Sequence, residues 1–438
     1  MAALGTRCLL FRARAGTIRG RLGEASSSSG RGVRIVTIDN TTRLALSSPA
    51  AVADAEYWPA GVADQQPNWE NYTPVREIHR FLRSRPPLID PDSIHTLRAA
   101  LATAAEGEIQ VLQAGDCAED TADTDHGLVS GKVELLDEIA GVMQRNTGKP
   151  VLTVGRIAGQ FAKPRSRTTE LVGGREIPVY RGELVNGPTA THAARRPDPV
   201  RLLDGYLAAR RITDILGDPV KGDVGIGVGQ GAVWTSHEAL VLDYEVPFLR
   251  RSHGQVYLGS THWPWIGERT RGPGSAHVEL LSRVSNPVSC KVGPNATPEE
   301  LTGLCGRLDP DREPGRLTFI ARMGASRVRD RLPALVRAVA HAGYPVIWMC
   351  DPMHGNTGIR ADGHKLRAVP VVGLEVERFI RSVTEAGGIP GGLHLETTPA
   401  PVHECVDRDE TETLVSTTLC DPRLNRRQAL AVVSKWRM

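Results

Sequence analysis

Short apolar runs recur along the chain, and each is followed by polar residues that include glycine. Eight such runs are found, at residues 109–115, 150–159, 224–229, 255–262, 288–293, 317–324, 345–352 and 391–399. Runs of this length bounded by turn residues are typical of buried β-strands. The third run, VGIGVG, is the weakest prediction, because alternate positions are glycine and offer no side chain to a core.

Segments with the apolar spacing of helices lie before and between these runs. They cover residues 92–105, 132–145, 237–251, 297–308, 330–343 and 376–388. In the first of them Ile94 and Leu97 share one face, and Asp92 or Ser93 is predicted to cap its start. The stretch QQPNWENYTP at 65–74 precedes it and reads as loop and turn.

Strands that alternate with helices predict a parallel sheet. Eight strand-like runs spread over about 290 residues favour an α/β fold of the (β/α)₈ TIM-barrel type, with an N-terminal helical extension. An open, doubly wound sheet is the alternative that the pattern leaves open. We therefore expect residues 51–438 to form a single barrel domain.

The first 50 residues differ in composition from the rest. Before Asp39 they contain seven arginines, a single acid, Glu24, and the run SSSSGRG. A start rich in Arg and Ser and poor in acids resembles an organellar transit peptide. We favour the simpler interpretation, a poorly ordered tail over residues 1–50, and a cytoplasmic protein.

Composition and cysteine spacing narrow the function classes. The chain is 40% apolar and 24% charged, as usual for globular proteins, and its net charge of +3 gives no reason to expect nucleic acid or a membrane surface as partner. None of its seven cysteines forms a CxxC pair. Reduced thiols are expected in a chain long enough to fold around a large core, and metal binding or catalysis is then the special use for any one of them.

Residues with distinctive chemistry lie at or after the ends of the predicted strands. Because the carboxyl ends of barrel strands converge on one face, residues far apart in sequence are expected to meet there. One set offers sulfur, nitrogen and oxygen donors suited to a divalent first-row metal. Its members are Cys117, His354, Glu396 and Asp421.

A second set at the same strand ends is cationic. It consists of Arg156, Lys163, Arg165, Lys291 and Arg322. Five cations directed into one pocket suit phosphate and carboxylate groups, which predicts two phosphorylated substrates, or one phosphate together with a carboxylate. Taken singly, each residue also has a simpler interpretation as a buried thiol, a solvated histidine or a surface ion pair. Their common position at strand ends favours the functional interpretation.

A set of longer motifs carries a family resemblance. They are QAGDCAE, RIAGQFAKPRS, WTSHEALVLDYE, WIGERTR, NPVSCKVGP, ARMGA, WMCDPMHGNT, GGLHLE and CDPRLN, in this order from about residue 57 to 430. The chain thereby resembles the class II 3-deoxy-D-arabino-heptulosonate 7-phosphate (DAHP) synthases. The resemblance implies a (β/α)₈ barrel that condenses phosphoenolpyruvate with erythrose 4-phosphate, the first step of the shikimate pathway.

The resemblance also implies roles for individual residues. It makes Cys117, His354, Glu396 and Asp421 the ligands of a divalent metal, Mn²⁺ or Co²⁺, with Zn²⁺ or Fe²⁺ as alternatives. For phosphoenolpyruvate it implies Arg156, Glu268, Arg269, Lys291 and Arg322, with Trp265 close by. Lys163, Arg165 and Ser166 of the KPRS stretch would reach substrate phosphate. Within this set Lys291, Glu268 and Arg269 are the candidate catalytic groups, and Glu268 is the candidate base for water.

Three departures from the family pattern keep other readings open. The segment between KPRS and VGQG is short, Pro264 replaces a usual aliphatic residue, and GERTRGPGSAHVE replaces a more polar linker. They suggest a paralogue of secondary metabolism, including an aminoDAHP synthase that takes an imino-sugar phosphate. A catalytically silent paralogue and a metal-free phosphosugar-binding barrel are further alternatives. A homo-oligomer is expected, with a chorismate mutase as a candidate partner.

Overall fold

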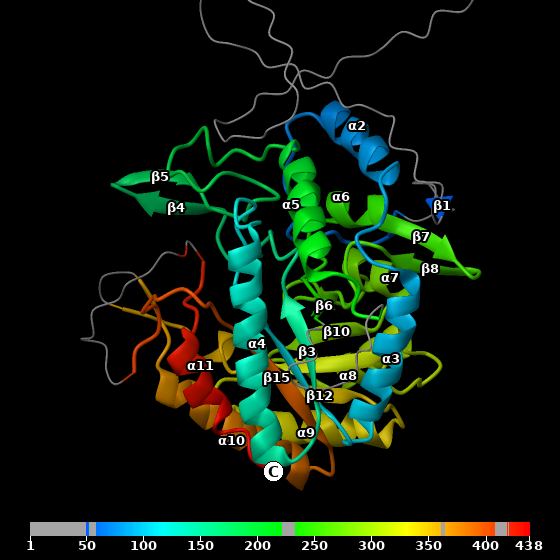
Figure 1. Ribbon diagram of the computed structural model, residues 1–438, viewed down its shortest axis with the longest axis vertical. Coiled ribbons are helices and arrows are strands. Elements are labelled where there is room, and N and C mark those ends of the chain that lie inside the picture. The colour runs from blue at the N-terminus through cyan, green and yellow to red at the C-terminus, as the bar shows by residue number, and fades with distance from the viewer. Residues whose placement is uncertain (1–49, 52–57, 221–232, 361–363, 408–417, 419) are drawn as a thin grey trace, which may run out of the picture. The chain divides into compact units, whose positions relative to one another are not determined.

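Eight parallel strands form the central sheet of the computed structural model, which describes residues 50–51, 58–220, 233–360, 364–407, 418 and 420–438 (Figure 1). All eight strands are buried along their length, as expected for strands covered on both faces. In chain order they are β2 (Gln110–Gly115), β3 (Val151–Arg156), β6 (Trp234–Thr235), β9 (Trp265–Ile266), β10 (Val288–Val292), β11 (Leu317–Ala321), β12 (Ile347–Cys350) and β15 (Pro390–Glu396).

The sheet closes on itself. Its strand order is β6-β3-β2-β15-β12-β11-β10-β9, and hydrogen bonds also join the two outer strands, β6 and β9, through residues in and beside them. Trp263 N donates to Thr235 O at 3.1 Å, and Trp265 N donates to His237 O at 3.0 Å. Going around the ring, the strands therefore follow one another in chain order, which is the arrangement of a (β/α)₈ barrel. The predicted fold is confirmed, and the open sheet is excluded.

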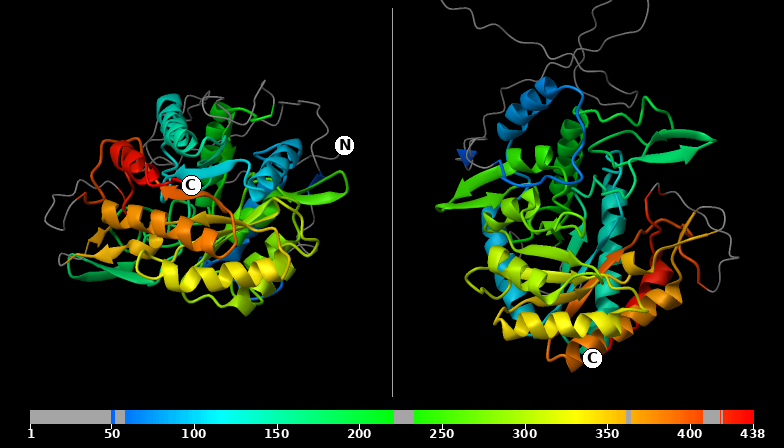
Figure 2. Two further views of the ribbon diagram at one scale, coloured as in Figure 1. Left: turned by 90° about the horizontal axis from the view of Figure 1, so that it is seen from below. Right: turned by 180° about the vertical axis from the view of Figure 1, so that it is seen from behind.

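Helices lie on the outside of this barrel and pack against their neighbours, α8 on α9, α9 on α10, α10 on α11 and α11 on α4 (Figure 2). Several begin at side chains that cap them: Asp125 accepts from the backbone of α4, and Thr297 forms a capping box at α8. The helices that follow the strands are α4 (His126–Thr147), α5 (Arg201–Leu216), α7 (Ala276–Ser282), α8 (Pro298–Leu308), α9 (Val328–His341), α10 (Val369–Glu385) and α11 (Arg426–Val433).

The N-terminal extension contributes two helices, α2 (Tyr72–Arg83) and α3 (Pro91–Ala105). The apolar face of α3, including Leu97, belongs to the same hydrophobic cluster as Ile109 and Ile347, which lie at the starts of two barrel strands. Helix α3 therefore covers the amino end of the barrel, which leaves the carboxyl end for the chemistry.

Three smaller sheets complete the described fold. Strands β1 (Ala50–Ala51), β7 (Leu249–Ser252) and β8 (Gln255–Leu258) form an antiparallel sheet. Two hairpins are formed by β4 (Thr169–Val172) with β5 (Arg175–Pro178), and by β13 (Gly358–Ile359) with β14 (Lys365–Leu366).

The predicted strand at 224–229 lies outside the described residues, and β6 is the third barrel strand. The prediction that 255–262 supplies the fourth barrel strand is wrong, because the strand within it, β8, pairs antiparallel with β7. The fourth strand is β9, whose two residues are too few to show a period.

The helix predicted at 237–251 is also wrong. This segment contains only the short α6 (Leu242–Glu245), a 3₁₀ turn and then β7. Its residues up to 250 are all buried, so apolar side chains occur on every side and imitate helical spacing. Pro247 further disfavours a continuous helix. At the other end, α2 starts at Tyr72, within the predicted loop at 65–74, and Asp90 caps α3 instead of Asp92 or Ser93.

Residues 49–438 form one compact unit, and residues 1–49 of the predicted tail lie outside the described part of the chain. Among the described helices, none is long and apolar enough to cross a membrane.

Candidate active site

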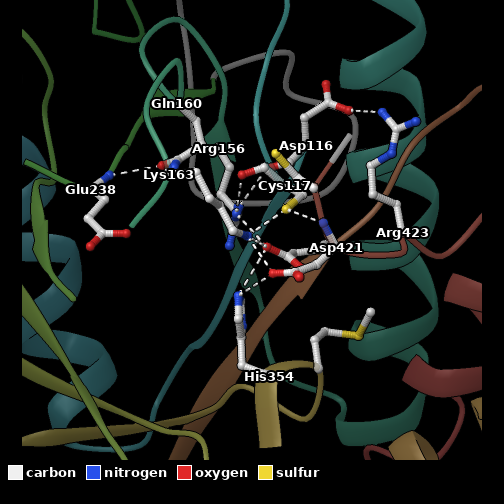
Figure 3. A network of polar contacts seen from close by, with 12 residues as sticks. Asp116, Cys117, Arg156, Gln160, Lys163, Glu238, His354, Asp421 and Arg423 are labelled. Carbon is white, nitrogen blue, oxygen red and sulfur yellow. Dashed lines mark hydrogen bonds and ion pairs between the residues drawn. The ribbon is translucent and has the colours of Figure 1, made fainter. Parts of the chain in front are cut away.

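Three of the predicted metal ligands meet at the carboxyl end of the barrel (Figure 3). Cys117 follows β2, Glu396 ends β15, and Asp421 lies in the loop before α11. One donor atom from each lies within 4.8 Å of the others, and all three side chains are buried. His354, in the 3₁₀ turn after β12, places Nε2 at 3.2 Å from Glu396 Oε1 and 3.8 Å from Asp421 Oδ2.

The ammonium group of Lys163 lies among these donors. Its Nζ atom is 2.5 Å from Sγ of Cys117, 3.2 Å from Oε1 of Glu396 and 2.8 Å from Oδ2 of Asp421. Burial alone would lower the pKa of Lys163, but Asp421, Cys117 and Glu396 raise it well above its ordinary value. A cation is thus already held by the three donors, and a thiol, two carboxylates and an imidazole are a fitting ligand set for a first-row divalent metal.

The two carboxylates remain ionised although they are buried. Burial would raise the pKa of Glu396, but His354, Lys163 and Arg367 hold it well below its usual range. Burial acts on Asp421 in the same direction, and Lys163 and Arg367 again keep its pKa well below the ordinary value. The site is therefore prepared for a positive charge.

The thiol of Cys117 is in a different electrostatic state. Burial raises its pKa well above the usual value, and a hydrogen bond with Cys420 and the charge of Glu396 act in the same direction. The backbone N–H of Asp421 also donates to Sγ of Cys117 at 3.3 Å. Cys117, Cys420 and Tyr180 belong to one small cluster of buried side chains. The thiol becomes a good metal ligand only on losing its proton, which an incoming cation favours.

Arg367 is a residue of this site that sequence reasoning missed. Its side chain is fully buried, donates to Glu396 Oε2 at 2.5 Å and to the carbonyl of Pro422 at 2.6 Å, and also bonds Thr357 Oγ1 at 2.8 Å. It lies between β14 and α10. Because β14 is not a barrel strand, Arg367 does not follow the end of a predicted barrel strand and could not be selected by that criterion. A lone arginine in the stretch KLRAVP carries no other signal.

A buried ion-pair network supports the two loops that carry Cys117 and Asp421. Asp116 bonds Lys132 on α4 at 2.8 Å and Arg423 at 2.6 Å. Arg423 in turn forms two bonds with Glu404, at 2.8 and 3.0 Å. Because Asp116 precedes Cys117 and Arg423 follows Asp421 by two residues, the network holds both ligands in place (Figure 3).

Two of the predicted phosphoenolpyruvate residues border the donor cluster directly. Arg156, at the end of β3, is 3.1 Å from Glu396 Oε1 and 2.5 Å from His394 Nε2. Lys291, in β10, bonds Asp351 Oδ2 at 3.0 Å, and burial lowers its pKa. Both lie over the ring of Trp265, Arg156 at 5.1 Å and Lys291 at 5.7 Å from its centroid.

Arg322 follows β11 and donates to the carbonyl of His354 at 3.1 Å. Asp351 at the end of β12 accepts from the imidazole of His354 at 2.7 Å. Burial would raise the pKa of Asp351, but His354 and Lys291 hold it well below its usual value. One carboxylate thus links the histidine of the donor cluster to a lysine of the cationic set.

The remaining predicted residues form their hydrogen bonds and ion pairs with residues outside the donor cluster. Arg269 donates to Ser166 Oγ at 2.6 Å, which joins the WIGERTR and KPRS stretches. Both carboxylate oxygens of Glu268 are bonded, to Arg271 at 3.0 and 3.1 Å and to the N–H of Gly293 at 2.6 Å. Arg165 is paired with Glu170 of the β4–β5 hairpin at 3.7 Å.

Glu238 is a second missed residue. Its backbone N–H donates to Gln160 Oε1 at 2.9 Å, while its carboxylate points away from that contact (Figure 3). The side chain is buried, Oε1 has no hydrogen-bond partner among the described residues, and burial raises its pKa despite the charges of Lys291 and Lys163. Glu238 lies in the motif WTSHEALVLDYE, which carries the family resemblance but by itself assigns no role to this glutamate.

Comparisons with known proteins identify relatives of this chain. A probable phospho-2-dehydro-3-deoxyheptonate aldolase from Pseudomonas fluorescens is 51% identical over 85% of this chain and 94% of its own length. Similar enzymes come from Streptomyces coelicolor (40% identity, 88% of this chain, 96% of the relative) and Mycolicibacterium smegmatis (35%, 84% and 90%).

A solved phospho-2-dehydro-3-deoxyheptonate aldolase from Francisella tularensis shares the fold, with a TM-score of 0.51 at 15% identity, over 82% of this chain and 97% of that one. The class-II DAHP synthetase family model matches residues 53–225 and 226–435. With that match and a relative at 51% identity, the chain belongs to the class-II DAHP synthetase family and is an enzyme of the 3-deoxy-7-phosphoheptulonate synthase type.

Proposed function

We propose that this enzyme condenses phosphoenolpyruvate with erythrose 4-phosphate in a metal-dependent reaction that yields DAHP and phosphate. One observation carries the proposal: three buried metal-type donors lie within 4.8 Å of one another, beside buried cations from other strand ends. Such a pocket suits substrates that bring several negative charges.

Cys117, His354, Glu396 and Asp421 would hold the metal, which supplies Lewis-acid polarisation of an aldehyde oxygen when bound. The ammonium group of Lys163 now lies among these donors, so it has to move away before a metal can bind to them. This ammonium group is then free to pair with a phosphate, as expected for the KPRS stretch. Its position beside Cys117 at 2.5 Å supports this dual use of the lysine.

Arg156, Lys291 and Arg322 are proposed to bind the phosphate and carboxylate of phosphoenolpyruvate, with Trp265 forming the floor. Holding this substrate with its C3 atom toward the aldehyde carbon is a proximity effect. Arg269 and Ser166 join the loops beside this pocket through their 2.6 Å bond, and Arg165 completes the cationic rim. Glu268 orients Arg271 and the loop at Gly293.

Water must then be added at C2 of the enolpyruvyl unit before phosphate leaves, and a base must accept a proton from that water. Glu268 is poorly suited to this role because both its oxygens are already bonded. Glu238 is better suited, since its Oε1 atom lacks a partner among the described residues and its pKa is raised. We therefore assign proton transfer to Glu238 in place of Glu268.

The proposal is tested by following phosphate release from phosphoenolpyruvate with and without erythrose 4-phosphate, and by identifying the seven-carbon product by mass. Release should require the aldehyde, stop after treatment with a chelator and return with Mn²⁺ or Co²⁺. Phosphate release at the same rate without the aldehyde and without the metal would refute the proposal. Replacing erythrose 4-phosphate with an imino-sugar phosphate in the same assay identifies the preferred aldehyde-type substrate.

A further inference from the structure

A carboxylate outside the site joins two of its loops. Glu375 lies on α10 with only 1% of its surface exposed. Its Oε1 atom accepts from the backbone N–H of Met323 at 3.0 Å and of Gly324 at 2.8 Å. Its Oε2 atom accepts from the side-chain amide of Asn356 at 2.5 Å. One side chain thus bonds the loop after β11 and the loop after β12.

Asn356 completes the connection from the other side. Its Oδ1 atom accepts from the N–H of Ala325 at 2.9 Å, and its Nδ2 atom donates to the carbonyl of Pro352 at 2.8 Å. These two partners fix which end of the amide is oxygen. The same amide therefore offers a donor to Glu375, and the carboxylate is used as an acceptor at both oxygens.

The two loops also touch through their backbones. Gly324 has φ of +85°, and a β-carbon on it would lie 2.8 Å from the carbonyl oxygen of Gly355. A β-carbon on Gly355 would lie 2.2 Å from the nitrogen of Gly324. No side chain fits at either position, so the loops can approach this closely only because both residues are glycine.

Each loop carries one proposed ligand-binding group. Arg322 immediately precedes Met323, and His354 immediately precedes Gly355. The guanidinium of Arg322 donates to the carbonyl of His354 at 3.1 Å, a direct link between the two. A shift of either loop would therefore displace both the arginine and the histidine.

We infer that Glu375 and Asn356 act as positioning residues that couple metal binding at His354 to phosphoenolpyruvate binding at Arg322. This inference rests on the proposed function and adds a pathway within it. A metal that fixes His354 also fixes Arg322 through the clamp, so each ligand should tighten the binding of the other by the same factor. Neither residue is expected to touch substrate.

The test compares Glu375→Gln with Glu377→Gln, a half-exposed position on the same helix that pairs with Lys435 at the surface. Glutamine keeps the size of Glu375, but its NH₂ group must face either Asn356 Nδ2 or two backbone N–H groups. In both orientations a donor faces a donor, so one of the two contacts is lost. Dissociation constants of Mn²⁺ and of phosphoenolpyruvate are measured by calorimetry, each with and without the other ligand. Circular dichroism confirms that each variant is folded.

We expect each ligand to tighten the other at least tenfold in the wild type and in Glu377→Gln, and less than threefold in Glu375→Gln. A second variant, Asn356→Asp, creates the opposite mismatch, with two carboxylates facing each other. Combining it with Glu375→Gln restores a donor opposite an acceptor between these two side chains, while the carbonyl of Pro352 still lacks its donor. The double variant should therefore recover more coupling than Asn356→Asp alone. This rescue would not follow from a general loss of stability.

The outcomes separate the inference from the proposed function. If the wild type binds both ligands but Glu375→Gln retains the full coupling factor, the clamp is refuted while the function stands. A double variant no better than Asn356→Asp would also refute it. A wild type that fails to bind phosphoenolpyruvate in the presence of Mn²⁺ would overturn the proposed function, and the coupling with it.

Discussion

His262 gives a quantitative test of how the barrel closes. Its ring lies at the junction of β6 and β9, where Nδ1 accepts from the N–H of Thr235 at 3.1 Å and is 2.9 Å from Thr235 Oγ1. The side chain is buried, and burial lowers the pKa of His262 from 6.5 to about 3. A proton on Nδ1 would remove the acceptor at the junction.

The sign of the pH dependence follows from this shift. Between pH 6.5 and 3 the unfolded chain binds a proton at this residue and the native protein does not, so stability is lost as the pH falls through this range. At roughly 1.4 kcal/mol per pKa unit, the loss is on the order of 2 kcal/mol at pH 5 and about 5 kcal/mol below pH 3.

The perturbation is His262→Asn, because the asparagine oxygen can occupy the position of Nδ1 and does not titrate. The exposed loop residue His192 provides the control variant His192→Asn. Urea unfolding at pH 8 and pH 5 gives the free energy of unfolding at each pH. The wild type and the control should lose about 2 kcal/mol more on this acidification than His262→Asn does. Equal losses in all three proteins would refute the argument.

Three further predictions concern the site and its control. Arg367→Met should lower the free energy of unfolding by about 3 kcal/mol, because it leaves the buried Glu396 without its partner, and urea titration at pH 8 measures this; a change under 1 kcal/mol would contradict it. Air oxidation of the metal-free enzyme should join Cys117 to Cys420 and abolish activity until a reductant is added; peptide mapping that finds both thiols free after inactivation would refute the disulfide. Phe, Tyr and Trp at millimolar concentration should change the rate little, because the short segment between KPRS and VGQG leaves little chain for a separate effector site, whereas saturable inhibition by any of them would reveal such a site.

The sequence predicted the architecture because long, regular elements dominate it. Six of the eight barrel strands are four residues or longer and coincide with apolar runs that were recognised. The two that were not predicted, β6 and β9, have two residues each. Their position depends on hydrogen bonds across the closing ring, such as Trp265 N to His237 O, and no local pattern encodes those contacts.

The candidate site was predictable where its residues lie at or just after the carboxyl end of a barrel strand. Cys117, Arg156 and Glu396 follow this rule, and the structure brings them together. Arg367 and Glu375 do not, because they act from a loop and from a helix, and their partners are known only once the chain is folded. A single sequence carries no signal that separates such residues from surface charges.

The central claim is that Cys117 binds a divalent metal together with nitrogen and oxygen donors. X-ray absorption at the zinc edge of the Zn²⁺-loaded protein tests it most directly, with Cys117→Ser as the matched variant. We expect one sulfur atom at about 2.3 Å with nitrogen and oxygen atoms at about 2.0–2.2 Å in the wild type, and loss of the sulfur in the variant. A wild-type spectrum that contains only nitrogen and oxygen neighbours would contradict it.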